Sequence, residues 1–311
     1  MSNELISGLI NGLANRDWKA LAKAITIVEN GYDGKELLLN YAYQTEKENC
    51  LIIGITGAGG AGKSTLIDSV LQLYSAKGKR IGVLAVDPSS SYTGGAVLGD
   101  RVRMGRHAMN ADIFIRSFAS RGSLGGISQG AKDVLYLYKS FGFDIIILES
   151  YGVGQAETDI TNFVDVTAVV LAPGNGDYMQ LAKAGTQEIA DIFVVNKADN
   201  AEADALYSQL LSTFSFLPVE RQPAVVKTVA RDQKGIDELV VQIQTAGEKL
   251  LPNRSTKKRM RIANEIFTNA LQVFDPTLRK EVDSVVDDVL AGNLTPFEAA
   301  NQLGSRIAFL K

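Results

Sequence analysis

The sequence predicts an α/β protein in which helices cover both faces of a mostly parallel sheet. Seven short apolar runs recur between residues 50 and 230, and stretches with helical periodicity separate most of them. Continuous apolar runs suit strands that are buried on both faces, as in a parallel sheet. Strands that alternate with helices indicate a doubly wound arrangement, in which ligands bind beyond the carboxyl ends of the strands.

The apolar runs that we interpret as strands are rich in Ile, Val and Leu. They span residues 50–56, 81–87, 113–118, 144–150, 166–173, 191–197 and 224–230. Several of them end in a polar or glycine-rich sequence, which places the polar residues at one edge of the predicted sheet. Binding residues are therefore expected directly after these runs.

A helical pattern precedes the sheet region. Leu21, Ala24, Ile25 and Val28 recur at the spacing of one helix face and form an apolar stripe. We expect two or more helices here that pack on the main domain. We assign residues 1–48 to an N-terminal helical extension.

A second helical pattern follows the sheet region. Apolar residues between positions 263 and 274 form one stripe, and Thr295 followed by Pro296 has the residue types of a helix start. This tail has apolar surface to bury on its own domain or on a second subunit. We assign residues 49–250 to the central domain and residues 251–311 to a C-terminal helical segment.

Composition excludes several classes of function. The chain has 311 residues, of which 46% are hydrophobic, and a net charge of −3, which argues against nucleic acid as the main partner. No apolar run approaches the length of a membrane span, and the N-terminus lacks the basic region of a signal peptide. One Cys and one His fit a reducing compartment and make a soft-metal site unfavourable. We expect a cytoplasmic protein.

A phosphate-binding loop follows the first predicted strand. The stretch fits the pattern G-x-x-x-x-G-K-[ST], and a helical pattern comes directly after it. Glycines let the backbone turn its N–H groups toward phosphate oxygens, and the helix start adds its positive dipole end. Lys63 is expected to reach the β- and γ-phosphates, and the Ser64 hydroxyl to bind Mg²⁺. The predicted loop, a P-loop, is Gly57-Ala58-Gly59-Gly60-Ala61-Gly62-Lys63-Ser64-Thr65.

A base-binding motif ends the run at residues 191–197. It reads Asn196-Lys197-Ala198-Asp199 and fits N-K-x-D. A carboxylate only accepts hydrogen bonds, and guanine offers it the ring N1–H and the exocyclic amine, whereas adenine has no matching pair of donors. The motif therefore predicts GTP and GDP as ligands. After the next strand, the stretch Thr228-Val229-Ala230 is expected to contact the base through its backbone.

Carboxylates at strand ends predict a magnesium site beside the P-loop. Asp87 and Glu149 each end an apolar run, and Asp100 lies in the polar, glycine-bearing stretch after Asp87. Such carboxylates commonly hold Mg²⁺ directly or through water. We predict Ser64, Asp87, Asp100 and Glu149 as the metal site. The strand that ends at Asp87 is expected to lie beside the strand of the P-loop.

Three polar segments are candidates for switches that respond to the nucleotide, namely residues 88–106, 152–159 and 174–185. The sequence lacks the D-x-x-G-Q pattern of small GTPases, so it does not identify the residue that orients the attacking water. Basic candidates for stabilising transition-state charge are Arg101, Arg103 and Lys183. The predicted catalytic set is Lys63, Asp100, Glu149 and Lys183.

Taken together, these motifs resemble one family, the MeaB/ArgK GTPases, whose human relative is the methylmalonic aciduria type A protein. The resemblance runs nearly from end to end. It includes the P-loop and the stretches NRDWKALAKAITIVEN, VDPSSSYTGGAVLGDRVRM, RSFASRGSLGGIS, ESYGVGQAE, APGNGDYMQ, EIADIFVVNKAD, KGIDEL and GNLTPFEAA. A match of this length is more specific than any single motif.

The resemblance implies a G protein that acts as a chaperone of an adenosylcobalamin-dependent acyl-CoA mutase. Such proteins gate cofactor loading and protect the mutase, and the mutase accelerates GTP hydrolysis. The resemblance also implies that Lys63, Ser64, Asp87, Asp100 and Glu149 lie at the Mg–phosphate site. It implies further that Lys183 lies in a third switch loop and that the C-terminal helices form a homodimer contact.

The sequence departs from the family pattern at three places. Gly59 replaces the usual proline of the P-loop, as in the G domains fused to isobutyryl-CoA mutases. The usual E-T-V-G-V-G-Q-S-E reads E-S-Y-G-V-G-Q-A-E from Glu149 onward, and Leu181-Ala182-Lys183 replaces Gly-Ile-Lys. These changes lie near the predicted switches, so they bear on which mutase is the partner and leave the nucleotide motifs intact.

Two alternative functions share parts of this pattern. A nickel-insertion maturation GTPase has the same core architecture but predicts a Cys/His cluster, whereas Cys50 and His107 each stand alone in the sequence. A P-loop kinase predicts the use of ATP, which the N-K-x-D motif disfavours.

Overall fold

The computed structural model describes residues 3–47, 49–87, 107, 110–119, 129–150, 160–161, 163–174 and 190–249, together with isolated positions between 282 and 294. The chain divides into two compact units, Met1–Leu251 and Pro252–Lys311. The first unit contains the whole sheet and the nucleotide motifs. The C-terminal helices expected from the sequence lie almost entirely outside the described residues.

In the described part of the chain, seven strands form one sheet, and they match the seven predicted runs. Their order in space is β3-β2-β4-β1-β5-β6-β7, and every neighbouring pair is parallel. Each strand overlaps one of the seven apolar runs. The bounds are β1 Leu51–Thr56, β2 Ile81–Asp87, β3 Ile113–Ala119, β4 Ile145–Ser150, β5 Val166–Leu171, β6 Ile192–Val195 and β7 Ala224–Lys227.

The expected position of the Asp87 strand is wrong. Strand β2 does not lie beside β1, because β4 is inserted between them, with Ile147 paired to Ile53 on one side and to Val83 on the other. A helical crossover can skip a position in a parallel sheet, so order along the chain does not fix neighbours. The apolar strand β4 is buried along its whole length and occupies the interior position.

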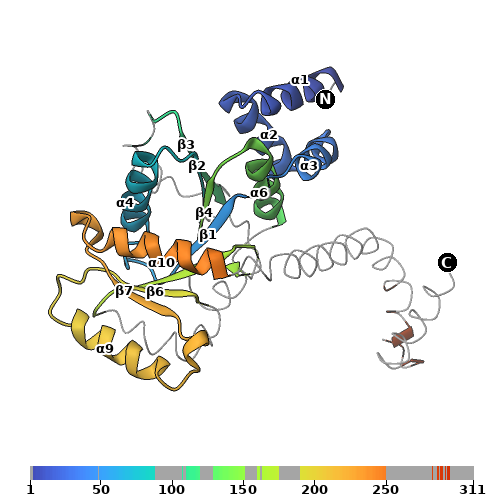
Figure 1. Cartoon of the computed structure of the whole chain (residues 1–311). Helices are drawn as coiled ribbons and strands as arrows, with labels where there is room; N and C mark the ends of the chain where they lie inside the picture. Colours follow the sequence, from blue (N-terminus) through green and yellow to red (C-terminus); the bar gives the residue numbers. More distant parts are fainter. Residues whose placement is uncertain are drawn as a thin grey trace. The chain divides into compact units, whose positions relative to one another are not determined.

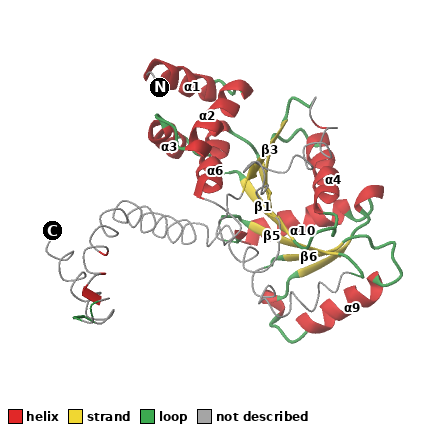
Figure 2. Ribbon diagram, turned by 180° about the vertical axis from the view of Figure 1, so that it is seen from behind, coloured by secondary structure: helices red, strands yellow, loops and turns green. Residues whose placement is uncertain are grey.

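Side chains alternate between the two faces of the sheet, and helices cover both. Ile53 and Ile55 contribute to the core shared with helices α4 (Lys63–Ala76) and α10 (Ile236–Lys249). Ile52, on the opposite face, packs in the core that contains α6 (Gln129–Phe141), and α9 (Ala203–Phe214) covers residues of β5 and β6. Figure 2 shows the strands lying between these helices. The doubly wound α/β fold is therefore confirmed.

Three N-terminal helices precede the sheet, and they group next to α6 (Figure 1). They are α1 (Asn3–Ala14), α2 (Trp18–Asn30) and α3 (Lys35–Gln44). Trp18 stacks on Phe114 of β3 with ring centroids 5.5 Å apart, and Arg80 lies over the Trp18 ring.

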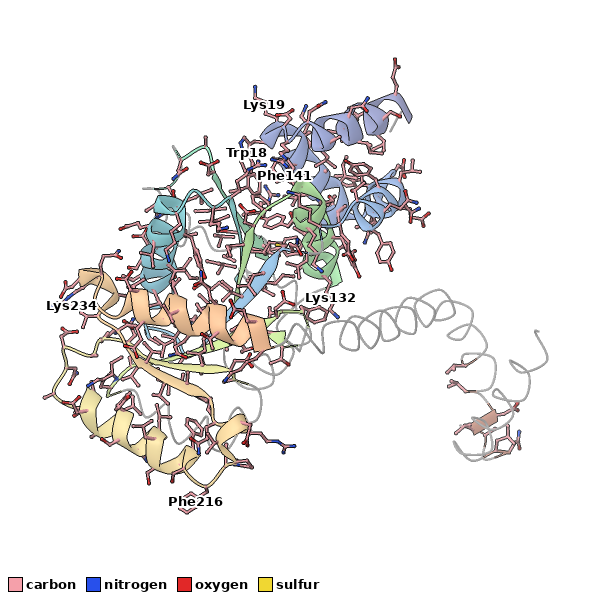
Figure 3. The ribbon with its side chains drawn as sticks, viewed as in Figure 1. Trp18, Lys19, Lys132, Phe141, Phe216 and Lys234 are labelled. Carbon is pink, nitrogen blue, oxygen red and sulfur yellow. The ribbon has the colours of Figure 1, made fainter. Side chains whose placement is uncertain are left out.

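The Trp18 ring also lies close to Phe141 of α6 (Figure 3). Arg116 Nη2 lies 3.0 Å from Glu29 Oε2, and Lys35 Nζ lies 2.7 Å from Asp133 Oδ2. The helices α2 and α3 therefore share a core and ion pairs with the sheet domain. None of the helices in the described part of the chain is long and apolar enough to cross a membrane.

Candidate functional site

The P-loop connects β1 to α4 at the centre of the sheet, where β4 lies on one side of β1 and β5 on the other. Two of its glycines are required by geometry. Gly57 has φ +139°, and a Cβ there would overlap the carbonyl oxygen of Val170. Gly62 has φ +91°, and a Cβ there would overlap the side-chain amide of Asn196. The P-loop can therefore approach both β5 and the loop that carries Asn196 only because these two positions lack side chains.

Lys63 is the first residue of α4, and its side chain is buried with 6% exposed. Its Nζ donates to the carbonyl oxygens of Gly57 and Ala58 at 2.7 and 3.0 Å. The ammonium group thus lies inside the curve of the loop, beside the positive end of the α4 dipole. A buried cation at a helix start is an arrangement that binds phosphate groups.

Ser64 and Glu149 meet at the end of β1. Ser64 Oγ donates to Glu149 Oε1 at 3.2 Å, and the Glu149 side chain is 5% exposed. A hydroxyl and a carboxylate are hard oxygen ligands of the kind that Mg²⁺ prefers. The structure therefore brings together two of the four predicted metal ligands. The next residue, Ser150, donates to Thr56 Oγ1 at 3.0 Å and joins β4 to β1 at the same level.

The side chains of the other predicted metal and catalytic residues lie outside the described atoms. Asp87 ends β2, where its backbone pairs with Ala119, but its side chain lies outside the described atoms. The segments 88–106, 151–159 and 175–189 also lie outside the described residues, and they include Asp100, Arg101, Arg103 and Lys183. The roles assigned to these residues stay predictions.

Asn196 joins the base motif to the P-loop. Its side chain is 2% exposed, and its Nδ2 donates to the carbonyl oxygen of Ala61 at 3.0 Å. Its Oδ1 accepts from Thr228 Oγ1 at 3.1 Å and from the Ala230 N–H at 3.2 Å. One buried amide therefore holds together the P-loop, the N-K-x-D loop and the stretch Thr228-Val229-Ala230.

The remaining residues of the base motif are more exposed. Lys197 has φ +56°, and its Nζ donates to the carbonyl oxygen of Gly60 at 2.7 Å. Asp199 Oδ2 accepts from Arg231 Nη2 at 2.9 Å. The predicted phosphate and base motifs are thus adjacent parts of one site.

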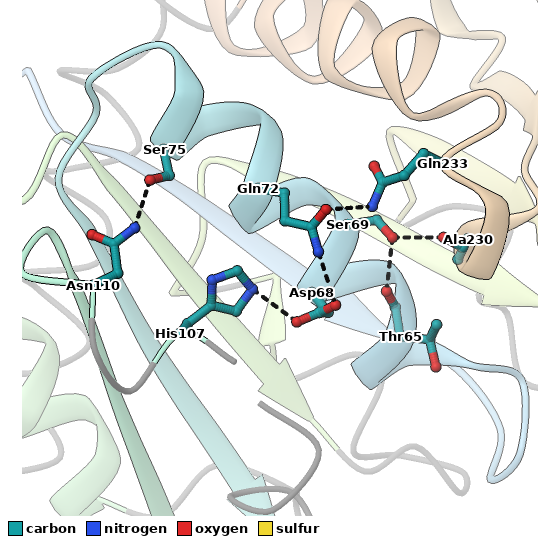
Figure 4. Close-up of polar contacts among 9 residues, drawn as sticks. All are labelled: Thr65, Asp68, Ser69, Gln72, Ser75, His107, Asn110, Ala230 and Gln233. Atoms are coloured by element: carbon teal, nitrogen blue, oxygen red, sulfur yellow. Dashed lines mark hydrogen bonds and ion pairs between the residues drawn. The ribbon is translucent and has the colours of Figure 1, made fainter. Parts of the chain in front are cut away.

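Helix α4 also carries contacts that sequence reasoning missed (Figure 4). Ser69 Oγ bonds the carbonyl oxygens of Thr65 and Ala230 at 3.1 and 2.7 Å. Gln72 Oε1 accepts from Gln233 Nε2 at 2.9 Å. Ser69 is a small polar residue within the apolar face of α4, and that position was the one signal that could have revealed its contact. Nothing in the local sequence pairs Gln72 with Gln233.

The same helix holds the residue that follows the first candidate switch segment. His107 Nε2 lies 2.8 Å from Asp68 Oδ1, and Asn110 Nδ2 donates to Ser75 Oγ at 2.7 Å. His107 is buried, although no pattern in the sequence places it near the P-loop helix. Helix α4 therefore contacts Ala230 and Gln233 on one side of the site, and His107 and Asn110 elsewhere along its length.

Comparison with known sequences identifies the family. The family described as "Methylmalonyl Co-A mutase-associated GTPase MeaB" matches residues 21–282. The chain belongs to the MeaB family of GTPases. It is 39% identical to a putative GTPase of Pyrococcus horikoshii, with 97% of this chain and 98% of that protein covered. It is 32% identical to the mouse protein named methylmalonic aciduria type A homolog, mitochondrial, with 96% of this chain and 78% of that protein covered.

A solved structure is similar to this chain over nearly its whole length. The crystal structure described as LAO/AO transport system kinase matches with a TM-score of 0.68 and 25% sequence identity. The match covers 99% of each chain. The family resemblance and the P-loop α/β fold predicted from the sequence are therefore both confirmed.

Proposed function

We propose that this MeaB-family chain is a G protein that binds and hydrolyses GTP and acts as a chaperone of an adenosylcobalamin-dependent acyl-CoA mutase. The observation that carries the nucleotide part is the contact of Asn196 with both loops. It brings a phosphate-binding lysine and a base-reading carboxylate into one site. The partner class is supported by the family description, which names methylmalonyl-CoA mutase.

The P-loop supports the phosphate part of this function. Lys63 is already inside the loop, where two carbonyl oxygens hold its ammonium group. Its ammonium group is also a donor of the kind that a β- or γ-phosphate oxygen accepts from. Charge that develops on the phosphate during hydrolysis would be stabilised by Lys63 and by the backbone N–H groups at the start of α4.

Magnesium fits the pair of oxygen ligands beside the loop. Ser64 Oγ would bind the ion directly, and Glu149 would bind it directly or through water, because both groups are buried at the end of β1. When bound, Mg²⁺ would offset phosphate charge. Asp87 and Asp100 remain proposed ligands on sequence grounds.

The base motif supports guanine rather than adenine. Asp199 follows β6 at the same edge of the sheet as the P-loop, and it is the acceptor that guanine's two neighbouring donors require. With adenine, the carboxylate would have no donors from the base, which is the kind of mismatch that enzymes reject strongly. A P-loop kinase that uses ATP would not need this carboxylate.

The mutase partner would control the rate of GTP hydrolysis. The sequence has no glutamine at the usual water-orienting position, so we propose slow intrinsic hydrolysis that a mutase accelerates. We further propose that residues 251–311 form a homodimer contact and that the protein works in the cytoplasm. Which acyl-CoA mutase is the partner depends on surfaces that include the departures after Glu149.

The deciding experiment measures GTP hydrolysis by the full-length chain with and without a panel of purified acyl-CoA mutases. We expect one mutase to accelerate phosphate release and to form a complex with the chain. The Lys63→Ala variant is the matched control, because it removes the phosphate contact and leaves the surface unchanged. A failure of every mutase in the panel to accelerate hydrolysis, or turnover of ATP equal to that of GTP, would contradict the proposal.

A further inference from the structure

Arg231 lies directly beside the carboxylate that reads the base. It is the middle residue of the 3₁₀ helix η4 (Ala230–Asp232), and its Nη2 lies 2.9 Å from Asp199 Oδ2. Its Nε lies 3.4 Å from Asp232 Oδ1 on the same turn. The guanidinium group therefore bridges two carboxylates that come from different loops.

The turn that carries Arg231 is held firmly in place. The Ala230 N–H donates to Asn196 Oδ1, and the Ala230 carbonyl accepts from Ser69 Oγ at 2.7 Å (Figure 4). Val229 and Lys234 bridge through their backbones, and Gln233 bonds Gln72 of α4. These contacts fix the backbone on both sides of Arg231, so η4 is a rigid support for its side chain close to Asp199.

The ion pair between Arg231 and Asp199 contributes little to the stability of the fold. The Arg231 side chain is 69% exposed and that of Asp199 is 42% exposed. Exposed ion pairs of this kind contribute little to the free energy of unfolding. The effect of Arg231 is therefore local, on the orientation of the Asp199 carboxylate.

The contact leaves the carboxylate able to bind guanine. An ionised carboxylate has about four lone-pair sites, two on each oxygen. Arg231 uses one site on Oδ2, while guanine requires one site on each oxygen for its N1–H and its exocyclic amine. Both partners can thus bind Asp199 at the same time.

We propose that Arg231 is a positioning residue for guanine recognition, because it holds the Asp199 carboxylate in the orientation that accepts both guanine donors. This inference rests on the proposed function, since it requires that Asp199 reads the base. Without Arg231, the carboxylate rotates more freely, and nucleotide binding must then restrict that rotation. The affinity that is lost belongs to the two hydrogen bonds between guanine and Asp199, and the phosphate contacts are unaffected.

The test compares GDP with inosine diphosphate, which has the ring N1–H but lacks the exocyclic amine. In the Arg231→Gln variant, we expect GDP affinity to fall about three- to tenfold, in line with one weakened charge-assisted hydrogen bond. Inosine diphosphate affinity falls less, so the ratio between the two affinities decreases. The Arg231→Lys variant keeps a charged donor and recovers part of that ratio.

Lys234→Gln is the matched control. It removes the same charge from the same loop, and Lys234 is exposed at the start of the segment leading into α10 (Figure 3). We expect the two affinities and their ratio to match those of the unaltered chain. An unchanged ratio in Arg231→Gln, an equal fall for both nucleotides, or tighter GDP binding would each overturn the inference.

Two further variants separate this inference from the proposed function. If Asp199→Asn does not shift preference from GDP toward xanthosine diphosphate, the base-site assignment itself fails. If it does shift preference while Arg231→Gln leaves the GDP-to-inosine ratio unchanged, only the role of Arg231 fails. In the Asp199→Asn background, Arg231→Gln is expected to leave xanthosine diphosphate affinity unchanged, because the carboxylate that it positions has been removed.

Discussion

The loop at residues 57–65 is shaped by its backbone, whereas the loop at residues 196–199 is held by side chains. In the first, two glycines with positive φ allow close approach to Val170 and Asn196. In the second, a single buried amide makes three hydrogen bonds. We therefore expect added side-chain atoms to disrupt residues 57–65, the phosphate loop. We expect removal of side-chain atoms to disrupt residues 196–199, the base loop.

The two loops meet where Gly62 lies against the side chain of Asn196, next to the hydrogen bonds of Asn196 to Ala61 and of Lys197 to Gly60. This contact means that a change in either loop is transmitted to the other. The difference between them also predicts different failures: the phosphate loop should lose catalysis, and the base loop should lose selectivity or stability. Substitutions in each loop test that distinction, from the largest expected effect to the smallest.

The largest effect is expected for Lys63→Ala. We expect GTP hydrolysis to fall by about 10²-fold or more, because the γ-phosphate loses its buried counter-charge. Phosphate release at saturating GTP measures this, and a thermal melt shows whether the variant is folded. Lys79→Ala removes an exposed lysine beyond the end of α4 and is expected to change nothing. Hydrolysis above a tenth of the original rate would contradict the assignment of Lys63.

Selectivity should change most with Asp199→Asn. We expect the ratio of GDP to xanthosine diphosphate affinity to fall by about 10²-fold, since the amide can donate where xanthine accepts. Competition binding with the two nucleotides measures the ratio. Asp204→Asn, at a carboxylate that is 83% exposed on α9, is the control. A ratio that stays the same in Asp199→Asn would show that this residue does not read the base.

Asn196→Ala tests the joint between the loops. We expect the free energy of unfolding to fall by about 3 kcal/mol, because the Ala230 N–H and the Ala61 carbonyl lose a buried partner. Urea denaturation measures the loss. Asn200→Ala removes one exposed contact, to the Glu202 N–H at 3.0 Å, and should cost about 1 kcal/mol or less. Equal losses in the two variants would contradict the role of Asn196 as the link between the two loops.

A pair of glycine substitutions tests the same contact from the other side. Gly60 and Gly62 both have positive φ, but a Cβ on Gly60 meets open space, whereas one on Gly62 meets Asn196. We expect Gly60→Ala to lower the unfolding free energy by about 1 kcal/mol through backbone strain. Gly62→Ala should lower it by about 1–2 kcal/mol more, because atoms also overlap. Equal losses in calorimetry would mean that Gly62 does not lie against the Asn196 side chain.

Tyr74 lies toward the end of α4 that is distant from the P-loop. A substitution there is expected to change stability without changing nucleotide binding. Burial raises the pKa of Tyr74 to about 12. Below pH 10 both the folded and the unfolded states keep the proton, and between pH 10 and 12 the unfolded state loses it first, so stability falls as the pH rises. Tyr74→Phe should reduce that alkaline loss by on the order of 2 kcal/mol and leave GDP affinity unchanged.

At pH 7 the Tyr74→Phe variant should be nearly as stable as the original chain. Among the described residues, none bonds with the buried Tyr74 hydroxyl, so its removal leaves no partner unsatisfied. Urea denaturation at pH 7 and pH 11 measures both effects. A fall in GDP affinity would show that the whole of α4, and not only its first turns, supports the site.

Much of the fold followed from local pattern. Runs of Ile and Val predicted all seven strands because burial on both faces requires apolar residues at every position. Strand order did not follow, because a helical crossover can skip a position in the sheet. The insertion of β4 between β1 and β2 is the example, and it separates the Asp87 strand from the P-loop strand.

For the site, the sequence predicted the motifs but not their connections. The motif around Lys63 is local, since glycine, lysine and a helix start must be contiguous to surround a phosphate. The bonds of Asn196 to Ala61 and of Ser69 to Ala230 cross more than a hundred positions of the chain. No local pattern encodes such a pair, and the same holds for Arg231 with Asp199.

The sequence by itself therefore predicted the parts of the site: a P-loop, an N-K-x-D motif and a parallel sheet that presents both. Only the tertiary structure decided how the parts join, through Asn196 between the loops and Arg231 beside Asp199. The physical reason is that residue types set which bonds are possible. The packing of strands and helices sets which distant donors and acceptors come within about 3 Å of each other.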